Sequence, residues 1–464
     1  MTIFLTALPG VIDENGFQDA HIPALAIYLL HSVLLSNGIN SEIIDGSTFL
    51  NDGEESFYST IKNELLKRVK EIDIICFSVN TFSWALTKIA CKIIKENTNA
   101  TIILGGLHPS KFADYIMKTT SVDYIIKGEG EMILPQLINE ISRDGDISCI
   151  AGISYRFKNK IYHNEGYGYV QQEHFNKQAL PSFDRIPQNV YRAIPVEASR
   201  GCLYNCNFCS IPHRNNYRSF AVEEIERRLL HAKQHASYFG NTSVINFVDD
   251  CFTANKQKVN ELLTRISKMN DGFTYFIEAR VNDIIKEEII DSLYPEIIDG
   301  IQIGIECGYD RGIKLVGKGT DLKRLFACAK KLKEKHLDSK AFYSFIIGFP
   351  WEGEEEINLT LDTIEKLSEL YNISALVNWL ILLPSRIWDN RNSYNITISE
   401  DVFDEPGWFF NKTVFFSTHP TVDQELFDRI EKRIIEMQIN GVNIVYNSPN
   451  FDYNKLINKI IYTA

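Results

Sequence analysis

Short apolar runs alternate with amphipathic stretches over the first 150 residues. The runs predict β-strands at residues 3–7, 42–44, 72–78, 101–104 and 124–126. The stretches between them carry apolar residues at helical spacing and predict helices at residues 24–36, 54–69, 85–96 and about 131–143. The strands are continuously apolar, which indicates burial on both faces. This alternation is typical of a doubly wound parallel sheet, an α/β fold.

Strands and helices alternate a second time between residues 193 and 383. The predicted strands are residues 194–197, 244–248, 274–279, 300–305, 340–346 and 375–381. The predicted helices between them are residues 222–235, 256–269, 286–293, 322–335 and 354–370. A closed barrel of this kind needs eight strand–helix units, so six units predict a partial, open (β/α)6 barrel.

The segments around these two regions are less regular. Residues 151–190 predict a linker containing a small hairpin near residues 153–163. Residues 385–464 predict a mainly helical region, with helices at 424–438 and 453–461. The expected division is therefore a sheet domain at 1–150, a linker at 151–190, a barrel at 191–384 and a C-terminal cap at 385–464.

Composition narrows the possible functions. The chain has 464 residues, with 48 Lys and Arg against 60 Asp and Glu, for a net charge of −12. This acidic balance argues against a sequence-independent nucleic-acid binder, which needs a basic face. The longest apolar run near the C-terminal third covers only residues 374–383 and contains Asn378, so no membrane span is expected. The N-terminus lacks the basic start and apolar core of a signal peptide, so a cytoplasmic protein is expected.

Nine cysteines are the most informative feature of the composition. An odd number of cysteines does not suit a disulfide framework. The simplest interpretation of the six scattered cysteines is that they are small buried hydrophobic residues. The other three, Cys202, Cys206 and Cys209, have the spacing C-x3-C-x2-C in the loop after the first barrel strand. Three interpretations compete: coincidental clustering, a zinc site completed by His213, and a three-cysteine iron–sulfur cluster with one open iron.

The cysteine motif resembles that of a known family, and this resemblance favours the iron–sulfur interpretation. C-x3-C-x-aromatic-C after the first strand of a partial barrel resembles the signature of the radical S-adenosylmethionine (radical SAM) enzymes, with Phe208 at the adenine-packing position. The resemblance implies a 4Fe-4S cluster on the three cysteines and SAM bound to its open iron. It also implies reductive cleavage of SAM to a 5′-deoxyadenosyl radical, with an electron donor of the flavodoxin or ferredoxin type.

Unusual residues follow the next barrel strands, where barrel enzymes place functional groups. Asp249 and Asp250 end the second strand, Arg280 the third, Glu306 the fourth, and Gly348 begins the turn after the fifth. Each has a simpler alternative: helix capping, surface ion pairing or an ordinary turn. They also resemble the SAM-binding segments of the family. That resemblance implies that the aspartates bind the amino group, Arg280 the carboxylate and Glu306 the ribose.

The glycine-rich strand ends of the first domain indicate which subgroup of radical SAM enzymes the chain resembles. They resemble the cobalamin-binding-type domain that precedes many radical SAM barrels. The implied cobalamin-binding residues are Ser78, Thr81, Gly105, Gly106, Leu107, His108, Gly128 and Glu129. The loop after the first strand lacks the histidine that ligates cobalt in such domains, so no histidine ligand on cobalt is expected. A vestigial sheet without a cofactor is the alternative.

The leading interpretation is a cobalamin-dependent radical SAM methyltransferase acting on an unactivated carbon of a small molecule or peptide. The runner-up is a peptide epimerase, or a rearrangement or cyclisation enzyme, in which Cys307 could return a hydrogen atom. A remote alternative is a non-catalytic cobalamin or cluster sensor. Substrate contacts are expected in the C-terminal cap, at Arg386, Trp388, Trp408, Phe409 and Phe410, for which a hydrophobic lid is the alternative.

Overall fold

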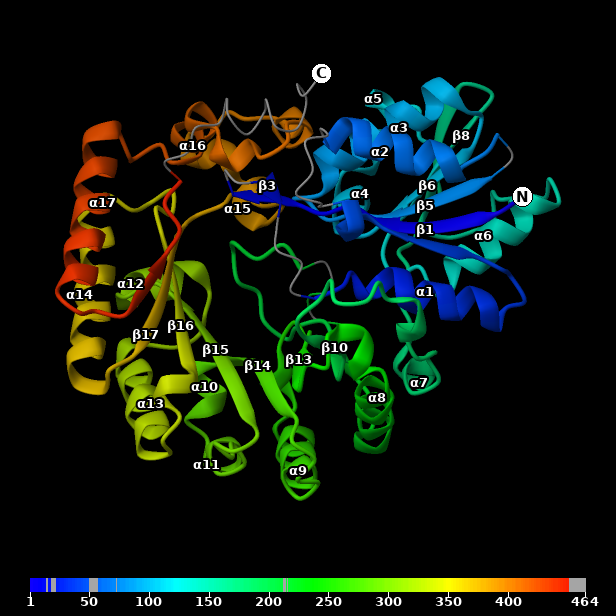
Figure 1. Ribbon diagram of the computed structural model, residues 1–464. Helices are drawn as coiled ribbons and strands as arrows, with labels where there is room; N and C mark the ends of the chain where they lie inside the picture. Colours follow the sequence, from blue (N-terminus) through cyan, green and yellow to red (C-terminus); the bar gives the residue numbers. More distant parts are fainter. Residues whose placement is uncertain are drawn as a thin grey trace.

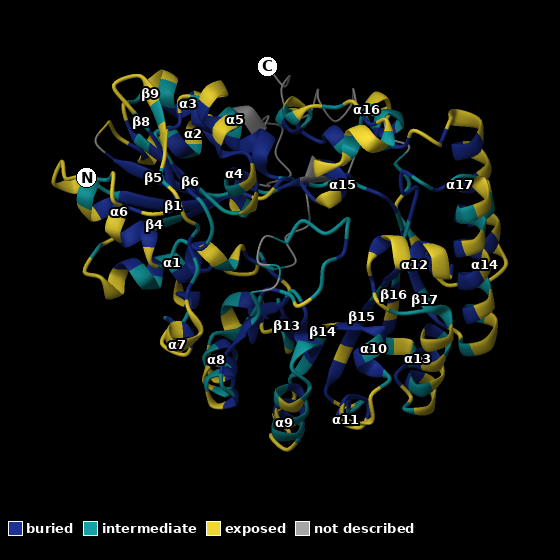
Figure 2. Cartoon of the chain, turned by 180° about the vertical axis from the view of Figure 1, so that it is seen from behind, coloured by how far each residue is buried: buried dark blue, intermediate teal, exposed yellow. Residues whose placement is uncertain are grey.

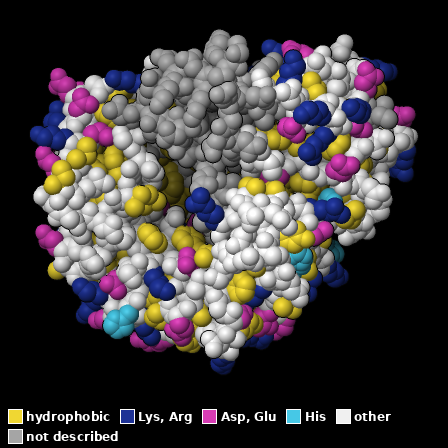
Figure 3. Space-filling view, viewed as in Figure 1, with side chains coloured by type: hydrophobic (Ala, Val, Ile, Leu, Met, Phe, Trp, Pro, Cys, Tyr) yellow, Lys and Arg dark blue, Asp and Glu magenta, His cyan; other side chains and the backbone are white. Residues whose placement is uncertain are grey.

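Two seven-stranded sheets dominate the computed structural model (Figure 1). The structure describes residues 1–13, 16–17, 22–49, 57–71, 73–211, 214 and 216–449. The expected helix at 453–461 lies outside the described residues. On the face seen in Figure 3, basic and acidic side chains are interspersed, and hydrophobic side chains surround a hollow. None of the described helices is long and apolar enough to cross a bilayer.

The first sheet has the strand order β4-β1-β5-β6-β7-β8-β9. Its strands are β1 (Ile3–Ala7), β4 (Glu42–Asp45), β5 (Ile74–Ser78), β6 (Thr101–Gly105), β7 (Tyr124–Ile126), β8 (Ile153–Phe157) and β9 (Lys160–His163). The pairs up to β7 are parallel. Helices α1 (Leu25–Ser36) and α6 (Ile133–Ser142) lie on one face, with α2 (Phe57–Arg68) and α3 (Trp84–Asn97) on the other (Figure 1). The predicted doubly wound sheet is confirmed.

The strand order reverses between β1 and β5. The chain passes from β1 to β4 on one side and returns to place β5 on the other. Ligands of doubly wound sheets bind beyond the carboxyl ends of strands at such a switch point. The smaller elements on this sheet are α4 (Leu107–Lys111), α5 (Ala113–Thr119), and the short strands β2 (Val11–Asp13) and β3 (Gly16–Phe17).

The expected hairpin forms, but not in a linker. β8 and β9 pair antiparallel through a turn in which Lys158 and Asn159 both have positive φ, 47° and 61°. Positive φ at both central residues is the geometry of a tight two-residue hairpin turn. β8 also pairs antiparallel with β7, so residues 153–163 extend the first sheet.

The second sheet has the order β10-β13-β14-β15-β16-β17-β18, with every neighbouring pair parallel. Its strands are β10 (Ile194–Val196), β13 (Val244–Phe247), β14 (Thr274–Arg280), β15 (Ile298–Glu306), β16 (Ala341–Ile347), β17 (Ser374–Trp379) and β18 (Ile444–Tyr446). The helices on its outer side are α8 (Val222–Gln234), α9 (Lys256–Ser267), α11 (Glu287–Ile290), α13 (Leu322–Glu334) and α14 (Glu354–Tyr371). The sheet curves into an open barrel, as predicted.

The seventh strand was not expected. β18 lies after α17 (Gln424–Ile439) and pairs with β17, so the mainly helical C-terminal region also supplies the last barrel strand. Three residues are too few for a strand to be recognised from its pattern. The other helices of this region are α15 (Arg386–Asp389) and α16 (Lys412–Thr418).

Buried and accessible residues alternate along the central strands of the barrel. On β16, Tyr343, Phe345 and Ile347 are buried, while Ser344 and Phe342 are accessible. Figure 2 shows the same arrangement, with buried strands and outer helices exposed on their far sides. One face of the sheet therefore packs against the helices, and the other lines a partly open interior.

Candidate functional site

The cysteine loop begins directly after β11 (Ser199–Arg200), a short strand paired with β12 (Arg218–Ser219). Gly201 has φ of +81°, a conformation that favours glycine, and its N–H donates to Asp250 at 2.8 Å. Farther along, the N–H of Asn207 donates to the Val316 carbonyl at 2.9 Å. The loop is thus held at the carboxyl end of the barrel strands from several sides.

The three thiols of this loop are placed differently. Cys206 is buried, whereas Cys202 and Cys209 are half-buried. The neighbouring Cys251 thiol lowers the pKa of Cys202, while burial raises the pKa of Cys209 to about 11. Among the described residues, no three His, Cys, Asp or Glu side chains converge on one ion position. In a cubane cluster each thiolate binds a different iron, so such a cluster does not need the three thiols to converge on one ion position. His213 of the zinc alternative lies outside the described residues.

Arg280, at the end of β14, reaches the cysteine loop. Its guanidinium lies 3.5 Å from the centre of the Tyr204 ring, and it donates to the carbonyl of Lys318. Its Nη1 lies 3.7 Å from the Cys206 sulfur. Arg280 thus brings a positive charge next to one of the three cysteines. Thiolates are the usual ligands of iron–sulfur clusters, so the donor set fits such a cluster.

Glu306 at the end of β15 is strained and ion-paired. It has φ of +72°, and the pairing with β16 is irregular between Gly304 and Glu306. Its carboxylate lies 2.7 Å from Lys318 Nζ, and both side chains are buried. A Cβ at Gly304 would come within 2.6 Å of the Lys318 nitrogen, so this glycine makes room for the pair. Strain of this kind clusters at functional sites.

Lys318 connects this pair to the cysteine loop, since its Nζ lies 5.8 Å from the ring centre of Phe208. Phe208 in turn lies edge-on to Phe349, with ring centres 6.2 Å apart. Glu278 stands two residues before Arg280 on β14. Desolvation raises the pKa of Glu278; the charge of Lys318 opposes this rise, and the charges of Asp250 and Glu306 add to it. The segments that follow β15 and β16 therefore meet at Phe208.

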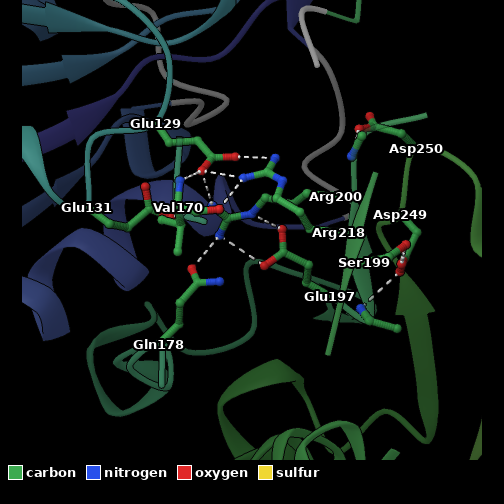
Figure 4. Close-up of polar contacts among 12 residues, drawn as sticks. Glu129, Glu131, Val170, Gln178, Glu197, Ser199, Arg200, Arg218, Asp249 and Asp250 are labelled. Carbon is green, nitrogen blue, oxygen red and sulfur yellow. Dashed lines mark hydrogen bonds and ion pairs between the residues drawn. The ribbon is translucent and has the colours of Figure 1, made fainter. Parts of the chain in front are cut away.

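The two aspartates after β13 contact the cysteine loop rather than open space (Figure 4). Asp249 is buried and accepts hydrogen bonds from the N–H of Ala198, at 3.1 Å, and from the Ser199 hydroxyl. Burial raises the pKa of Asp249 to about 8. Asp250 accepts from Gly201, as described above. The structure thus gives both aspartates a role in shaping the loop, and a contact of either with SAM stays a prediction.

Gly348 has a structural reason to be glycine. Its φ is +77°, and a Cβ there would lie 2.6 Å from the Trp379 ring and 2.7 Å from the His419 ring. The turn after β16 therefore packs against the C-terminal cap.

The structure places Cys307 in the helix layer, and its suggested role as a hydrogen donor stays a prediction. Cys307 is fully buried, and its sulfur lies 3.7 Å from Glu352 Oε1. The following residue, Gly308, packs against α14, where its N–H donates to Thr360 at 3.0 Å. The strand end alone suggested exposure, but the bulge in β15 turns this side chain into the helix layer.

Glu352→Gln is expected to flatten the pH dependence of stability between pH 4.5 and 7. Burial raises the pKa of Glu352 from 4.5 to about 7, so the folded state binds this proton more tightly than the unfolded state does. Stability from this group is present at acidic pH and is lost as the pH rises toward 7, by up to about 3 kcal/mol. Melting temperatures of both proteins across this range would measure it. If the melting temperatures of the two proteins changed with pH in parallel, the raised pKa of Glu352 would be contradicted.

A cavity of about 310 Å³ opens at the switch point of the first sheet, and we call it the first-sheet cavity. Five of the predicted cobalamin-binding residues line it: Ser78, Gly105, Gly106, Gly128 and Glu129. Thr81 and Leu107 instead line a neighbouring cavity of about 250 Å³. The two cavities flank the turn after β6.

His108 lines neither cavity. It is buried, its ring stacks on Trp84 with centres 5.1 Å apart, and it also contacts Phe112 and Phe403. Burial lowers the pKa of His108 to about 3. The structure therefore gives His108 a packing role, and a contact of this residue with cobalamin stays a prediction. The His108 ring belongs to the core between the first sheet and the C-terminal cap.

Glu129 anchors a buried ion network between the two sheets (Figure 4). Arg218 donates to both of its carboxylate oxygens, at 2.8 and 2.7 Å, and the N–H of Val170 donates at 2.5 Å. Burial opposes ionisation of Glu129, but the Arg218 hydrogen bonds and the charge of Arg200 outweigh it and lower the pKa. The Glu129 carboxylate therefore takes part in the contacts of this interface.

Arg200 extends this network to the cysteine loop. It pairs with Glu131 at 2.6 Å and with Glu197 at 2.5 Å, and it donates to Gln178 at 3.0 Å. Glu197 and Arg200 also line the first-sheet cavity. Neither Arg200 nor Arg218 stands out in the sequence, because their partners lie 69 and 89 residues away.

Comparison with known proteins agrees with these observations. Residues 196–364 match the family model of the Radical SAM superfamily. The chain is 27% identical to the uncharacterized methyltransferase PH0819 of Pyrococcus horikoshii, over 85% of this chain and 82% of that one. It is 23% identical to the anaerobic magnesium-protoporphyrin IX monomethyl ester cyclase of Synechocystis sp., over 90% of this chain and 82% of that one.

Two solved structures have a similar fold. One is TsrM from Kitasatospora setae, a radical S-adenosylmethionine methyltransferase with tryptophan and a SAM analog bound. Its TM-score is 0.71 at 13% identity, over 97% of this chain and 92% of that one. The other is OxsB, a cobalamin-dependent S-adenosylmethionine radical enzyme with aqua-cobalamin bound. Its TM-score is 0.66 at 21% identity, over 93% of this chain and 56% of that one. Residues 196–364, which hold the cysteine loop and most of the open barrel, therefore form a Radical SAM domain, and together with the doubly wound sheet before it they have the fold of these two solved structures.

Proposed function

We propose that this enzyme is a cobalamin-dependent radical SAM methyltransferase that acts on an unactivated carbon. The observation that best supports this proposal is the position of the first-sheet cavity. Its far side is closed by Glu197, Arg200 and Val248, from the barrel strand ends. Arg200 is two residues from Cys202, so a ligand in this cavity would lie beside the cysteine loop. A methyl donor and a radical generator must act on the same substrate atom, which requires such proximity.

The residues at the strand ends have distinct roles in this proposal. Cys202, Cys206 and Cys209 would hold the cluster, and Phe208 would pack on the adenine of SAM. Arg280 would bind the SAM carboxylate, and Glu306, held by Lys318, would bind its ribose. When bound, the cluster would supply the electron that cleaves SAM, drawn from an external donor, and cobalamin would supply the methyl group.

Anaerobic reconstitution tests the proposal. The protein is loaded with iron and sulfide, with and without cobalamin, and then given SAM and dithionite. We expect 5′-deoxyadenosine and, with cobalamin, S-adenosylhomocysteine. Deoxyadenosine without retained cobalamin would favour an epimerase or another radical rearrangement. Retained cofactors without any SAM cleavage would indicate a sensor and refute the proposal.

Gly105→Leu should remove cobalamin without removing SAM cleavage. Gly105 lines the first-sheet cavity, and an added Cβ would meet no atom within 4 Å, so a larger side chain projects into the cavity without disturbing the fold. We expect cobalamin retention to fall at least about tenfold, because overpacking a binding site costs about 1–3 kcal/mol. Absorbance of the purified holoenzyme measures it.

Gly105→Ala is the matched control, since a methyl group leaves most of this cavity open. Equal cobalamin retention in the wild type and Gly105→Leu would show that cobalamin does not bind in the first-sheet cavity.

A further inference from the structure

The largest of the cavities described for this structure lies at the end of β17, and we call it the aromatic cavity. Its volume is about 510 Å³, within the usual range of small-molecule sites. Four parts of the chain build it: Phe82 from the first domain, residues 378–382 at the end of β17 and just after it, residues between 408 and 419 of the cap, and residues 446–449 at the end of β18 and just after it. Phe82 and Phe409 meet edge to face with ring centres 5.3 Å apart, which joins the first domain to the cap.

The aromatic cavity adjoins the predicted SAM-binding turn. Trp379 and His419 line it, and these are the two rings that a Cβ at Gly348 would strike. Phe349, next in the turn, contacts Phe208 of the cysteine loop. A wall ring, Trp379 or His419, and the ring of Phe349 therefore lie between the cavity and the cysteine loop.

Charge is missing from the walls of this cavity. Among the described residues that line it, none is Asp, Glu, Lys or Arg. Its one histidine, His419, is buried, and burial lowers the pKa of His419 to about 4, so this ring is neutral near pH 7. An unpaired ion would lose its hydration here without a compensating partner. The cavity thus selects against ionic ligands.

Two buried polar atoms of the wall lack a partner among the described residues, Nε1 of Trp408 and Nε2 of His419. Trp408 is buried, and its indole N–H has no hydrogen-bond partner among the described residues. A buried donor without an acceptor is costly, and a ligand that supplies an acceptor removes that cost. Trp408, Phe409 and Phe410 also supply flat apolar surfaces.

We propose that the aromatic cavity binds the substrate, and that the group it holds is uncharged, planar and apolar, with one hydrogen-bond acceptor for Trp408. This inference rests on the proposed function. It assigns substrate contact to three of the expected cap residues. Trp388 instead packs in the core against Phe112 and Phe403, and Arg386 lines a different cavity.

Three bicyclic probes test the inference by calorimetry on the full chain reconstituted with iron and sulfide. 2-Quinolinone is neutral and has a carbonyl acceptor, naphthalene has no acceptor, and quinoline-2-carboxylate is an anion. We expect 2-quinolinone to bind best and the anion at least tenfold more weakly. Trp408→Phe keeps the aromatic surface but removes the donor. It should weaken 2-quinolinone about tenfold and leave naphthalene within twofold.

Trp351→Phe is the matched control. Its indole N–H also has no partner among the described residues, but Trp351 does not line the cavity. It should leave all three affinities within twofold. Phe409→Ala should weaken both neutral probes. Equal binding of the anion, no saturable binding of any probe at 1 mM, or an unchanged 2-quinolinone affinity in Trp408→Phe would overturn the inference.

The binding measurements need no SAM and no reductant, so the two proposals can fail separately. A protein that cleaves SAM but binds no probe refutes the substrate assignment alone. A protein that binds 2-quinolinone through Trp408 but produces no S-adenosylhomocysteine with cobalamin refutes methyl transfer, and with it the reading of this ligand as a methyl acceptor.

Discussion

Replacing Cys202, Cys206 or Cys209 singly with alanine is expected to abolish both the iron–sulfur cluster and the formation of 5′-deoxyadenosine from SAM. A site with three thiolate ligands has no spare ligand, so two remaining thiolates would leave a second iron without a protein ligand. Each variant should lose the visible absorbance of the reconstituted cluster and its electron paramagnetic resonance signal after reduction. SAM cleavage should fall to the level of a control without protein.

Two other cysteines provide matched controls. Cys149 is exposed, so Cys149→Ala tests whether losing an accessible thiol matters in itself. Cys251→Ala is stricter, because the Cys251 thiol contacts Cys202 but lies outside the C-x3-C-x2-C spacing. Both variants should keep the cluster. SAM cleavage that persists in any of the three ligand variants would refute the function proposed for this site.

Glu129→Gln is expected to destabilise the protein by about 3–5 kcal/mol, because it leaves a buried arginine without its counter-charge. The Glu129 and Arg218 side chains are both nearly inaccessible, and Arg218 has no other carboxylate at hydrogen-bond distance among the described contacts. Since this pair joins the two sheets, the loss should appear as a lower melting temperature. It should also appear as earlier proteolysis between the sheets.

The exposed pair of Glu354 and Arg429 is the matched control. It has the same two-pronged geometry, with nitrogen–oxygen distances of 2.9 and 2.7 Å, but both side chains are about half exposed. Exposed pairs contribute little, so Glu354→Gln should leave the melting temperature nearly unchanged. Equal effects of the two substitutions would mean that the buried network does not hold the sheets together.

Local patterns were sufficient to predict most of this fold. Apart from β18, the strands of both sheets and the cysteine loop are marked by neighbouring residues, and each formed within a few residues of its predicted position. The burial of His108 and Cys307 could not be predicted in the same way. Both stand at strand ends, where the chain turns, and tertiary packing decides whether a side chain enters the site or the core.

The interface could not be read from the sequence for a related reason. Arg200 and Arg218 look like ordinary surface residues, and only the folded chain brings Glu129 and Glu131 to them. The aromatic cavity likewise unites Phe82 with residues more than 290 positions later. Long-range contacts of this kind leave no periodic signal.

The late strand β18 has a consequence for biosynthesis. β17 ends at Trp379, and its outer neighbour does not begin until Ile444. During translation β17 is therefore an open sheet edge until residues 444–446 have been made, and open edges pair readily with other chains. A chain cut short between β17 and β18 would carry this edge permanently, so such a fragment should aggregate more readily than a chain that includes β18.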